Sequence, residues 1–115
     1  MGAGRLILGS VAALALALSL AGCNSNDVNR TAFDGVYFKT KAKKLGDDLA
    51  DFTVQIPGVS RSLEGARGAG EYEGTRYCIK NFGTSDITWV VGPETDPARL
   101  VIEKDTLTFQ GRCRS

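Results

Sequence analysis

The chain has 115 residues, three cysteines, no histidine and a formal net charge of +1 at pH 7. Its length allows one small domain. The balanced charge argues against a general nucleic-acid binder, which normally carries a strong basic excess, and the lack of histidine removes the commonest catalytic base and metal ligand.

An apolar segment lies near the N-terminus. Arg5 is followed by a nearly continuous apolar run over residues 6–20 that contains no charge. The run has about 15 residues, fewer than the roughly 20 that a helix needs to cross the hydrocarbon core of a membrane. It therefore predicts a cleaved export signal over residues 1–22. An uncleaved membrane anchor is the alternative.

A four-residue motif ends this segment. Leu20-Ala21-Gly22-Cys23 resembles the lipobox of bacterial lipoproteins, in which an aliphatic residue and two small residues precede a cysteine. The resemblance implies cleavage before Cys23, lipidation of its thiol, and anchoring to a membrane outside the cytoplasm, because two or more acyl chains anchor a protein stably. Asn24 follows where the family uses aspartate for retention at the inner membrane. The resemblance therefore favours the periplasmic side of the outer membrane.

A polar segment and two strands are expected next. Residues 23–32 contain little that could be buried, so they predict a flexible tether before a domain over 33–115. Apolar and polar residues alternate over 36–43 and again over 52–56, which is the period of strands that bury one face. Gly46-Asp47-Asp48 marks a turn between them. The two strands are expected to form an antiparallel hairpin.

The segment after Pro57-Gly58 has helical periodicity. It predicts a helix from about Ser62 to Asn81, with Ser60 or Ser62 as the N-cap and Gly83 as the stop. One face of the helix carries small or apolar residues at helical spacing: Leu63, Ala66, Gly70, Gly74 and Tyr77, with Cys78 at its edge. Each glycine inside a helix costs roughly 1 kcal/mol relative to alanine. Close approach of the helix to a sheet would offset this cost, so we expect such an approach.

Three further strands are predicted over 87–91, 99–103 and 106–111. The last two flank Lys104-Asp105, a two-residue connection suited to a tight hairpin. The expected fold class is α+β. It consists of a small antiparallel sheet, with the chain order ββαβββ, and one helix packed on a face of the sheet.

Cys78 and Cys113 remain as a pair once Cys23 carries lipid. In an oxidising compartment such a pair predicts a structural disulfide. The bond is expected to link the helix to the sheet edge, with Cys113 just beyond the last strand. A redox-active pair is the alternative, although the spacing is not Cys-x-x-Cys. Two thiols without histidine are too few for a metal site, and no cofactor is predicted.

Lys39, Lys41, Lys43 and Lys44 are the most noticeable charge feature. The first three are expected on one strand face, where they form a candidate basic surface for anionic lipid headgroups or another polyanion. The favoured alternative is a solvated edge strand whose lysines prevent sheet-to-sheet association, because three aspartates follow within 47–51. These aspartates lack the ligand spacing of a calcium loop, so no metal site is predicted.

No residue is predicted to be catalytic. The serines at 60, 62 and 85 have no histidine partner, and neither a Ser-x-x-Lys nor a Gly-x-Ser-x-Gly motif occurs. Four aromatic residues are expected to cluster around the helix end and the third strand: Tyr72, Tyr77, Phe82 and Trp89. Trp89 should share a face with Ile87 and Val91. A core role is favoured over an exposed contact with a protein or glycan.

A second resemblance concerns the domain itself. Residues 70–87, together with Gly111-Arg112-Cys113, are similar to small envelope lipoproteins of alphaproteobacteria. The resemblance supports the paired cysteines and the α+β fold, and it carries no catalytic residue. The expected function is a non-enzymatic, lipid-anchored module that contacts another envelope protein and no nucleic acid. The alternatives are a small envelope enzyme that uses residues outside familiar motifs and an anion binder that uses the lysine face.

Overall fold

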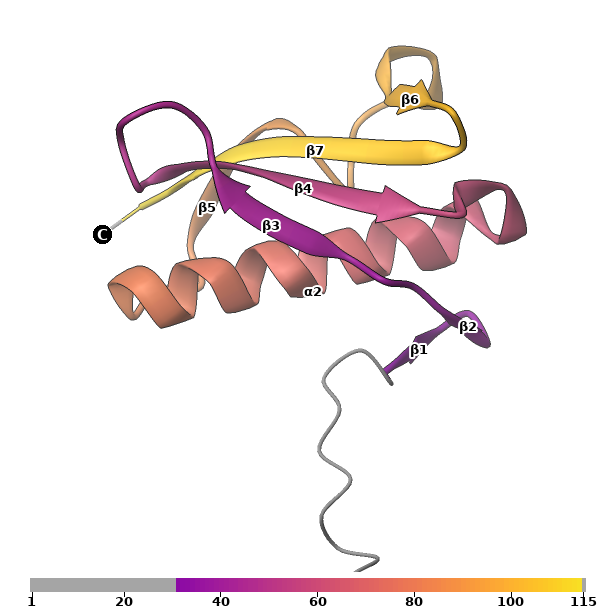
Figure 1. The fold of residues 1–115 in the computed structure, drawn as a ribbon, viewed down its shortest axis with the longest axis horizontal. Helices are drawn as coiled ribbons and strands as arrows, with labels where there is room; N and C mark the ends of the chain where they lie inside the picture. The colour runs from indigo at the N-terminus through magenta and orange to yellow at the C-terminus, as the bar shows by residue number, and fades with distance from the viewer. Residues whose placement is uncertain (1–30, 115) are drawn as a thin grey trace, which may run out of the picture.

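A computed structural model describes residues 31–114 of the chain (Figure 1). The predicted signal peptide, the predicted lipidation site Cys23 and the predicted tether as far as residue 30 lie outside the described residues. An antiparallel sheet forms one layer and a single long helix, α2, forms the other. The predicted α+β class is therefore confirmed.

The main sheet has β7 at its centre. Its strands lie in the order β3 (Lys41–Lys44), β4 (Asp51–Pro57), β7 (Thr106–Cys113) and β5 (Ile87–Val91). A short strand, β6 (Val101–Glu103), also pairs with β7. One side of β7 pairs with β4 from Thr106 to Arg112, and β6 and β5 share the other side. All of these pairs are antiparallel, and α2 provides the crossover from β4 to β5 (Figure 1).

Both predicted hairpins are present. β3 pairs with β4, and β6 pairs with β7. Lys104 and Asp105 connect β6 to β7 with φ values of 51° and 59°. Two consecutive positive φ angles match the right-handed twist of the strands that a two-residue turn joins. Asp105 also holds the segment after β4, because its carbonyl oxygen accepts hydrogen bonds from Gly58 N and Val59 N.

A small hairpin that the sequence did not predict precedes the sheet. β1 (Ala32–Phe33) pairs with β2 (Val36–Tyr37), and residues 38–40 belong to no strand. The prediction of one continuous strand over 36–43 is therefore wrong. Phe38, only 3% exposed, is buried in the core at this break. The guanidinium of Arg61, from the 3₁₀ turn η2 (Val59–Arg61), lies 4.9 Å from the centre of its ring.

Helix α2 (Leu63–Phe82) matches the predicted helix to within one residue at each end. The Ser62 hydroxyl accepts a hydrogen bond from Gly65 N at 2.9 Å, so Ser62 rather than Ser60 is the N-cap. Gly83 ends the helix with φ of 69°, a left-handed conformation that suits glycine. The expected close approach to the sheet is confirmed at Gly70, where an added Cβ would lie 2.5 Å from the ring of Phe109.

The core lies between α2 and the sheet face that it covers. Its largest fully buried side chains are Phe52, Phe109, Ile56, Leu107, Val54 and Cys78. Trp89 packs edge-on against Phe52 and Phe109, with 5.6 Å between ring centres in each pair. Its predicted core role is confirmed.

Two strand boundaries differ from prediction at the C-terminal end. The strand expected to start at residue 99 begins at Val101, because Asp96 and Pro97 start a 3₁₀ turn, η3 (Pro97–Arg99). β7 extends to Cys113, which pairs with Ile87.

A β-bulge also changes the face of Val91. The irregularity lies between Trp89 and Val91 and places Val91 opposite Gln110. Ile87 and Trp89 pack against the core, but the expectation that Val91 shares their face is wrong.

Candidate functional site

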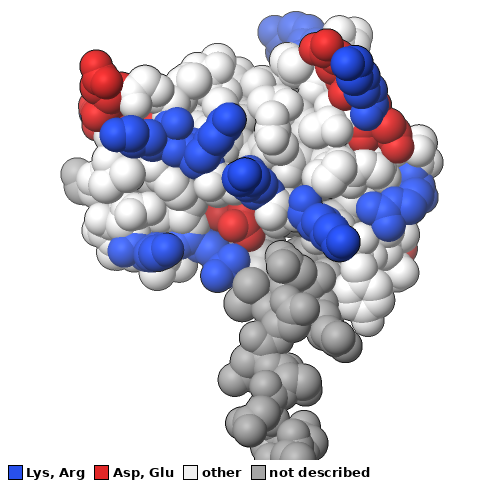
Figure 2. Space-filling view, viewed as in Figure 1, with Lys and Arg blue, Asp and Glu red and all other residues white. Residues whose placement is uncertain are grey.

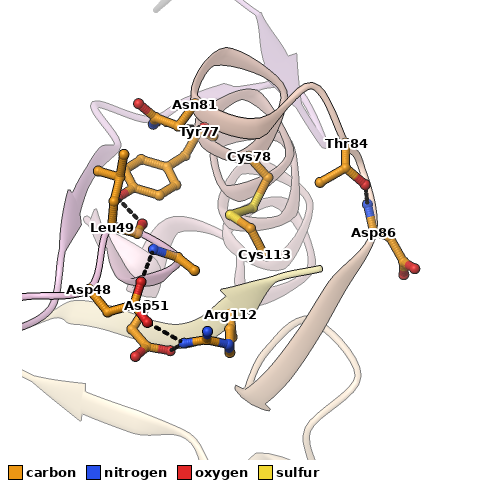
Figure 3. The surroundings of a disulfide bond; sticks show 11 residues. Asp48, Leu49, Asp51, Tyr77, Cys78, Asn81, Thr84, Asp86, Arg112 and Cys113 are labelled. Carbon is orange, nitrogen blue, oxygen red and sulfur yellow. Dashed lines mark hydrogen bonds and ion pairs between the residues drawn. A yellow bond between two sulfur atoms is a disulfide. The ribbon is translucent and has the colours of Figure 1, made fainter. Parts of the chain in front are cut away.

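The predicted disulfide is present and buried. Cys78 in the last turns of α2 is bonded to Cys113 at the end of β7, with an S–S length of 2.01 Å (Figure 3). β7 lies between β4 and β5, so the bond joins the helix to an inner strand rather than to the sheet edge as expected. Its role here is to fasten the two layers together.

An ion-pair group lies beside the disulfide. Arg112 Nη1 is 2.9 Å from Asp48 Oδ2 and 3.0 Å from Asp51 Oδ1 (Figure 3). The other carboxylate oxygen of Asp48 accepts a hydrogen bond from Ala50 N. That backbone hydrogen bond, followed by the hydrogen bond from Arg112, lowers the pKa of Asp48 below its usual value. Two of the three aspartates after the lysines are therefore already paired.

Replacing Arg112 with glutamine is expected to raise the pKa of Asp48 without restoring its usual value, because Ala50 N still donates to the carboxylate. A carboxyl group with a lowered folded-state pKa stabilises the fold above its unfolded-state pKa, and this stabilisation is lost as pH falls through the folded-state pKa. The Arg112→Gln variant should therefore lose part of this acid-sensitive stabilisation. Carboxyl-detected NMR titration measures the pKa directly.

Arg114→Gln is the matched control, since Arg114 lies 3.9 Å from Asp86 and forms no ion pair with Asp48 among the described residues. An unchanged pKa of Asp48 in the Arg112→Gln variant would contradict the role given to this ion pair. A complete return to the ordinary value would show instead that the Ala50 hydrogen bond has no effect.

The edge strand β3 places its lysines on both faces of the sheet. Lys41 lies opposite Gln55 and Lys43 opposite Thr53, so both point to the face that α2 does not cover. Lys44 lies opposite the buried Phe52 and points to the helix side. Lys39 is exposed in the break before β3. The expectation that Lys39, Lys41 and Lys43 share one strand face is therefore met by the last two only.

A shallow groove of about 330 Å³ separates β3 from the C-terminal half of α2. Its apolar lining comes from Ala42, Leu49 and Tyr77. The Tyr77 hydroxyl donates a hydrogen bond to Leu49 O at 2.7 Å, which ties the turn after β3 to the helix (Figure 3). Burial, and then the negative charge of Asp48, raises the pKa of this hydroxyl. The tyrosine is therefore a neutral hydrogen-bond donor in the groove wall.

The charged lining of the same groove comes from Lys44, Glu73, Arg76 and Lys80. The Glu73 carboxylate is 3.1 Å from Arg76 Nη1 and accepts a hydrogen bond from Thr40 Oγ1 at 3.2 Å. Arg76 therefore offsets the charge of Glu73. Lys44 and Lys80 form no ion pair with any described residue, so the groove has a positive rim.

Only two of the four expected aromatic residues, Tyr77 and Trp89, lie in one group. Tyr77 stacks on Phe52 at 4.9 Å, and Trp89 packs against the same ring. Tyr72 instead contacts Phe33 of β1 at 5.7 Å, while Phe82 is exposed at the helix end. The single predicted cluster is wrong, because Tyr72 lies off the helix face that packs on the sheet.

Two of the serines considered as nucleophiles hold turns. Ser60 Oγ donates to Asp105 Oδ2 at 2.9 Å, and Ser60 N donates to Asp105 Oδ1. Ser62 Oγ donates to Asp34 Oδ2 at 2.7 Å while capping α2. These hydrogen bonds join the β1–β2 hairpin and the β6–β7 turn to the start of the helix.

A second groove, of about 300 Å³, lies on the sheet face that α2 leaves open. Strands β4, β6 and β7 supply its lining, which includes Gln55, Val101, Thr106 and Thr108. This surface was not predicted from the sequence. The available signal was the alternation in β7, where polar residues at 106, 108 and 110 separate buried ones. Such alternation marks a strand with one face left exposed.

Comparison with known protein families, curated proteins and solved structures gives no match for this chain. No helix among the described residues is long and apolar enough to cross a membrane. Within residues 31–114, no group of three or more histidine, cysteine or acidic residues is arranged to hold a metal ion. The described residues thus define a small, disulfide-linked α+β domain with exposed lysines along the edge strand β3 and two shallow grooves.

Proposed function

We propose that this protein is an exported lipoprotein, anchored to a cell-envelope membrane through Cys23, whose domain is a non-enzymatic binding module for another envelope protein. The observation that carries the proposal is the buried Cys78–Cys113 disulfide in a chain whose residues 20–23 also resemble a lipobox. Structural disulfides form and persist in oxidising compartments and are rare in the cytosol. The bond and the lipobox therefore point independently to export.

The polar groups of the domain support binding over catalysis. Ser60 and Ser62 are engaged in turns, and Glu73 is paired with Arg76. The two grooves are shallow surfaces of the kind that a partner can cover. The groove on the open sheet face offers hydroxyl and amide groups beside the exposed side chain of Val101. This mixture suits a protein surface, because interfaces combine apolar contacts with hydrogen bonds.

Intact-mass measurement on protein purified from its native membrane tests the anchor. We expect a chain that begins at Cys23, carries acyl mass, and reacts with a thiol reagent only after reduction. The Cys23→Ser variant is the control and should carry no acyl mass. A full-length, unacylated chain with three free thiols would overturn both export and anchoring.

Photo-cross-linking in intact cells tests the binding module. A cross-linking residue at Thr108, in the open-face groove, should capture one reproducible envelope protein. The same residue at Glu64, whose side chain is 84% exposed on α2, is the control and should not capture that protein. Failure to capture any reproducible partner from the groove would count against a protein-binding role.

A further inference from the structure

Five exposed lysines form a basic edge along β3 and the adjoining end of α2. They are Lys39, Lys41, Lys43, Lys44 and Lys80. In Figure 2 the β3 edge of the two layers faces the viewer, and basic side chains extend across this face from the sheet layer to the helix layer. None of the five forms an ion pair with another residue in the described part of the chain. Their positive charges are therefore available to an external anion.

The acidic side chains near this edge are largely neutralised within the domain. Arg112 pairs with both Asp48 and Asp51, and Arg76 pairs with Glu73. Asp47, in the turn after β3, has no cationic partner among the described residues. The aspartates that seemed from the sequence to cancel the lysine charges are thus mostly occupied elsewhere.

Exposed apolar side chains adjoin the lysines. Leu45 and Leu49, in the turn between β3 and β4, are 41% and 42% exposed. Lysines beside exposed leucines resemble the composition of surfaces that lie in the membrane interface, where cations meet headgroups and apolar side chains enter the acyl boundary.

The connection to the proposed anchor limits how far this edge can lie from a membrane. Residues 24–30 separate Cys23 from Thr31, the first described residue. Even a fully extended chain spans at most about 29 Å between these two positions. β1 then packs on α2, the helix that forms one wall of the groove beside β3. The β1–β2 hairpin leads directly to β3 (Figure 1). The lysines are therefore within reach of the headgroups.

We propose that the basic edge docks on the anionic phospholipid headgroups of the membrane that holds the anchor. The proposal rests on the proposed lipid anchor and adds an orientation to it. Docking of the β3 edge leaves β6, which lines the far side of the open-face groove, free for a partner, because β4 and β7 separate it from β3. Each lysine near an anionic surface strengthens the association by roughly 5-fold in equilibrium constant.

The test uses native, acylated protein, whose intact mass is measured first. The protein is reconstituted in vesicles of phosphatidylcholine alone or of phosphatidylcholine with phosphatidylglycerol, then labelled with an amine reagent and analysed by mass spectrometry. We expect several-fold slower labelling of the five lysines in the anionic vesicles. Lys104, in the β6–β7 turn, should label equally in both. High salt should remove the difference, because it screens exposed charges.

A pair of matched variants tests the edge itself. The double variant Lys41→Gln, Lys43→Gln should reduce the ratio of docked to undocked protein by roughly 30-fold. The remaining lysines Lys44 and Lys80 measure this change, because they should lose their protection from amine labelling. Arg99→Gln with Lys104→Gln removes the same charge from exposed positions near β6 and should leave that protection intact.

Three outcomes would overturn docking. Equal labelling of acylated protein in both kinds of vesicle would reject docking and leave the lipid anchor standing. An unacylated chain would instead remove the proposed function and, with it, this inference. In the third outcome, inorganic phosphate added to phosphatidylcholine vesicles protects the five lysines from labelling as strongly as the anionic vesicles do. That result would reject the membrane surface as the ligand and assign the edge to free phosphate.

Discussion

Replacing Cys78 and Cys113 together with alanine is expected to lower the free energy of unfolding by about 3–4 kcal/mol. The two cysteines are 35 residues apart in the chain, and their bond removes conformational freedom from the unfolded state. Both side chains are buried, so the change also leaves unfilled space between α2 and β7. Denaturant-induced unfolding, followed by the fluorescence of the single tryptophan, measures the loss.

The unmodified protein kept in a reducing agent should unfold at a lower denaturant concentration than the oxidised protein, because it lacks the bond. It should unfold at a slightly higher one than the double variant, because it keeps both buried side chains. This comparison separates the bond from the alanine substitutions. A reduced protein as stable as the oxidised one would show that packing alone holds the two layers. For a domain this small, the expected loss is a large share of a typical total stability. If the loss is as large as expected, the domain depends on an oxidising compartment to fold.

The elements that the sequence predicted best are those with local signals. Helix α2 has a capping serine at Ser62 and a glycine at Gly83 that adopts the left-handed conformation. The β6–β7 hairpin has two residues suited to its turn, Lys104 and Asp105. In both cases the deciding interactions join residues close together in the chain, so the residue pattern contains them.

The break before β3 depends instead on distant contacts. Val36, Phe38 and Ala42 have the same alternation whether the segment forms one strand or two. The burial of Phe38, together with the position of Arg61 over its ring, distinguishes the two arrangements. These two residues are far apart in the chain and meet only when η2 lies beside the break before β3. Periodicity cannot reveal such a contact.

The sequence could not predict, for the same reason, whether the lysines of the basic edge are neutralised. In the sequence, Asp48 and Asp51 follow the lysines closely and seem to cancel them. In the structure both pair with Arg112, more than 60 residues away. That pairing depends on β4 lying beside β7, and strand order is a property of the whole sheet. Whether the lysines are free could therefore be judged only after the sheet was known.

Replacing Gly70 with alanine is expected to destabilise the domain by about 1–2 kcal/mol, although alanine is the better helix former by roughly 1 kcal/mol. The new Cβ would lie 2.5 Å from Phe109 Cε2 and 2.9 Å from Ile56 Cδ1. Both neighbours are fully buried and have no free space into which to move. The helix must therefore shift away from the sheet, and the loss of packing exceeds the gain in helix propensity. Thermal or denaturant unfolding gives the change in stability.

Gly68→Ala is the matched control on the same helix, and we expect it to be neutral or to stabilise by up to about 1 kcal/mol. The three atoms nearest to its Cβ would all belong to the ring of Phe33, the closest at 3.0 Å. That ring is half-buried and belongs to the short β1–β2 hairpin, so it can shift at little cost. Changes of opposite sign in the free energy of unfolding at positions 68 and 70 would show that glycine is needed for close packing at position 70 and not at position 68. Stabilisation at both would mean that the helix can move from the sheet freely, and the packing argument for Gly70 would then fail.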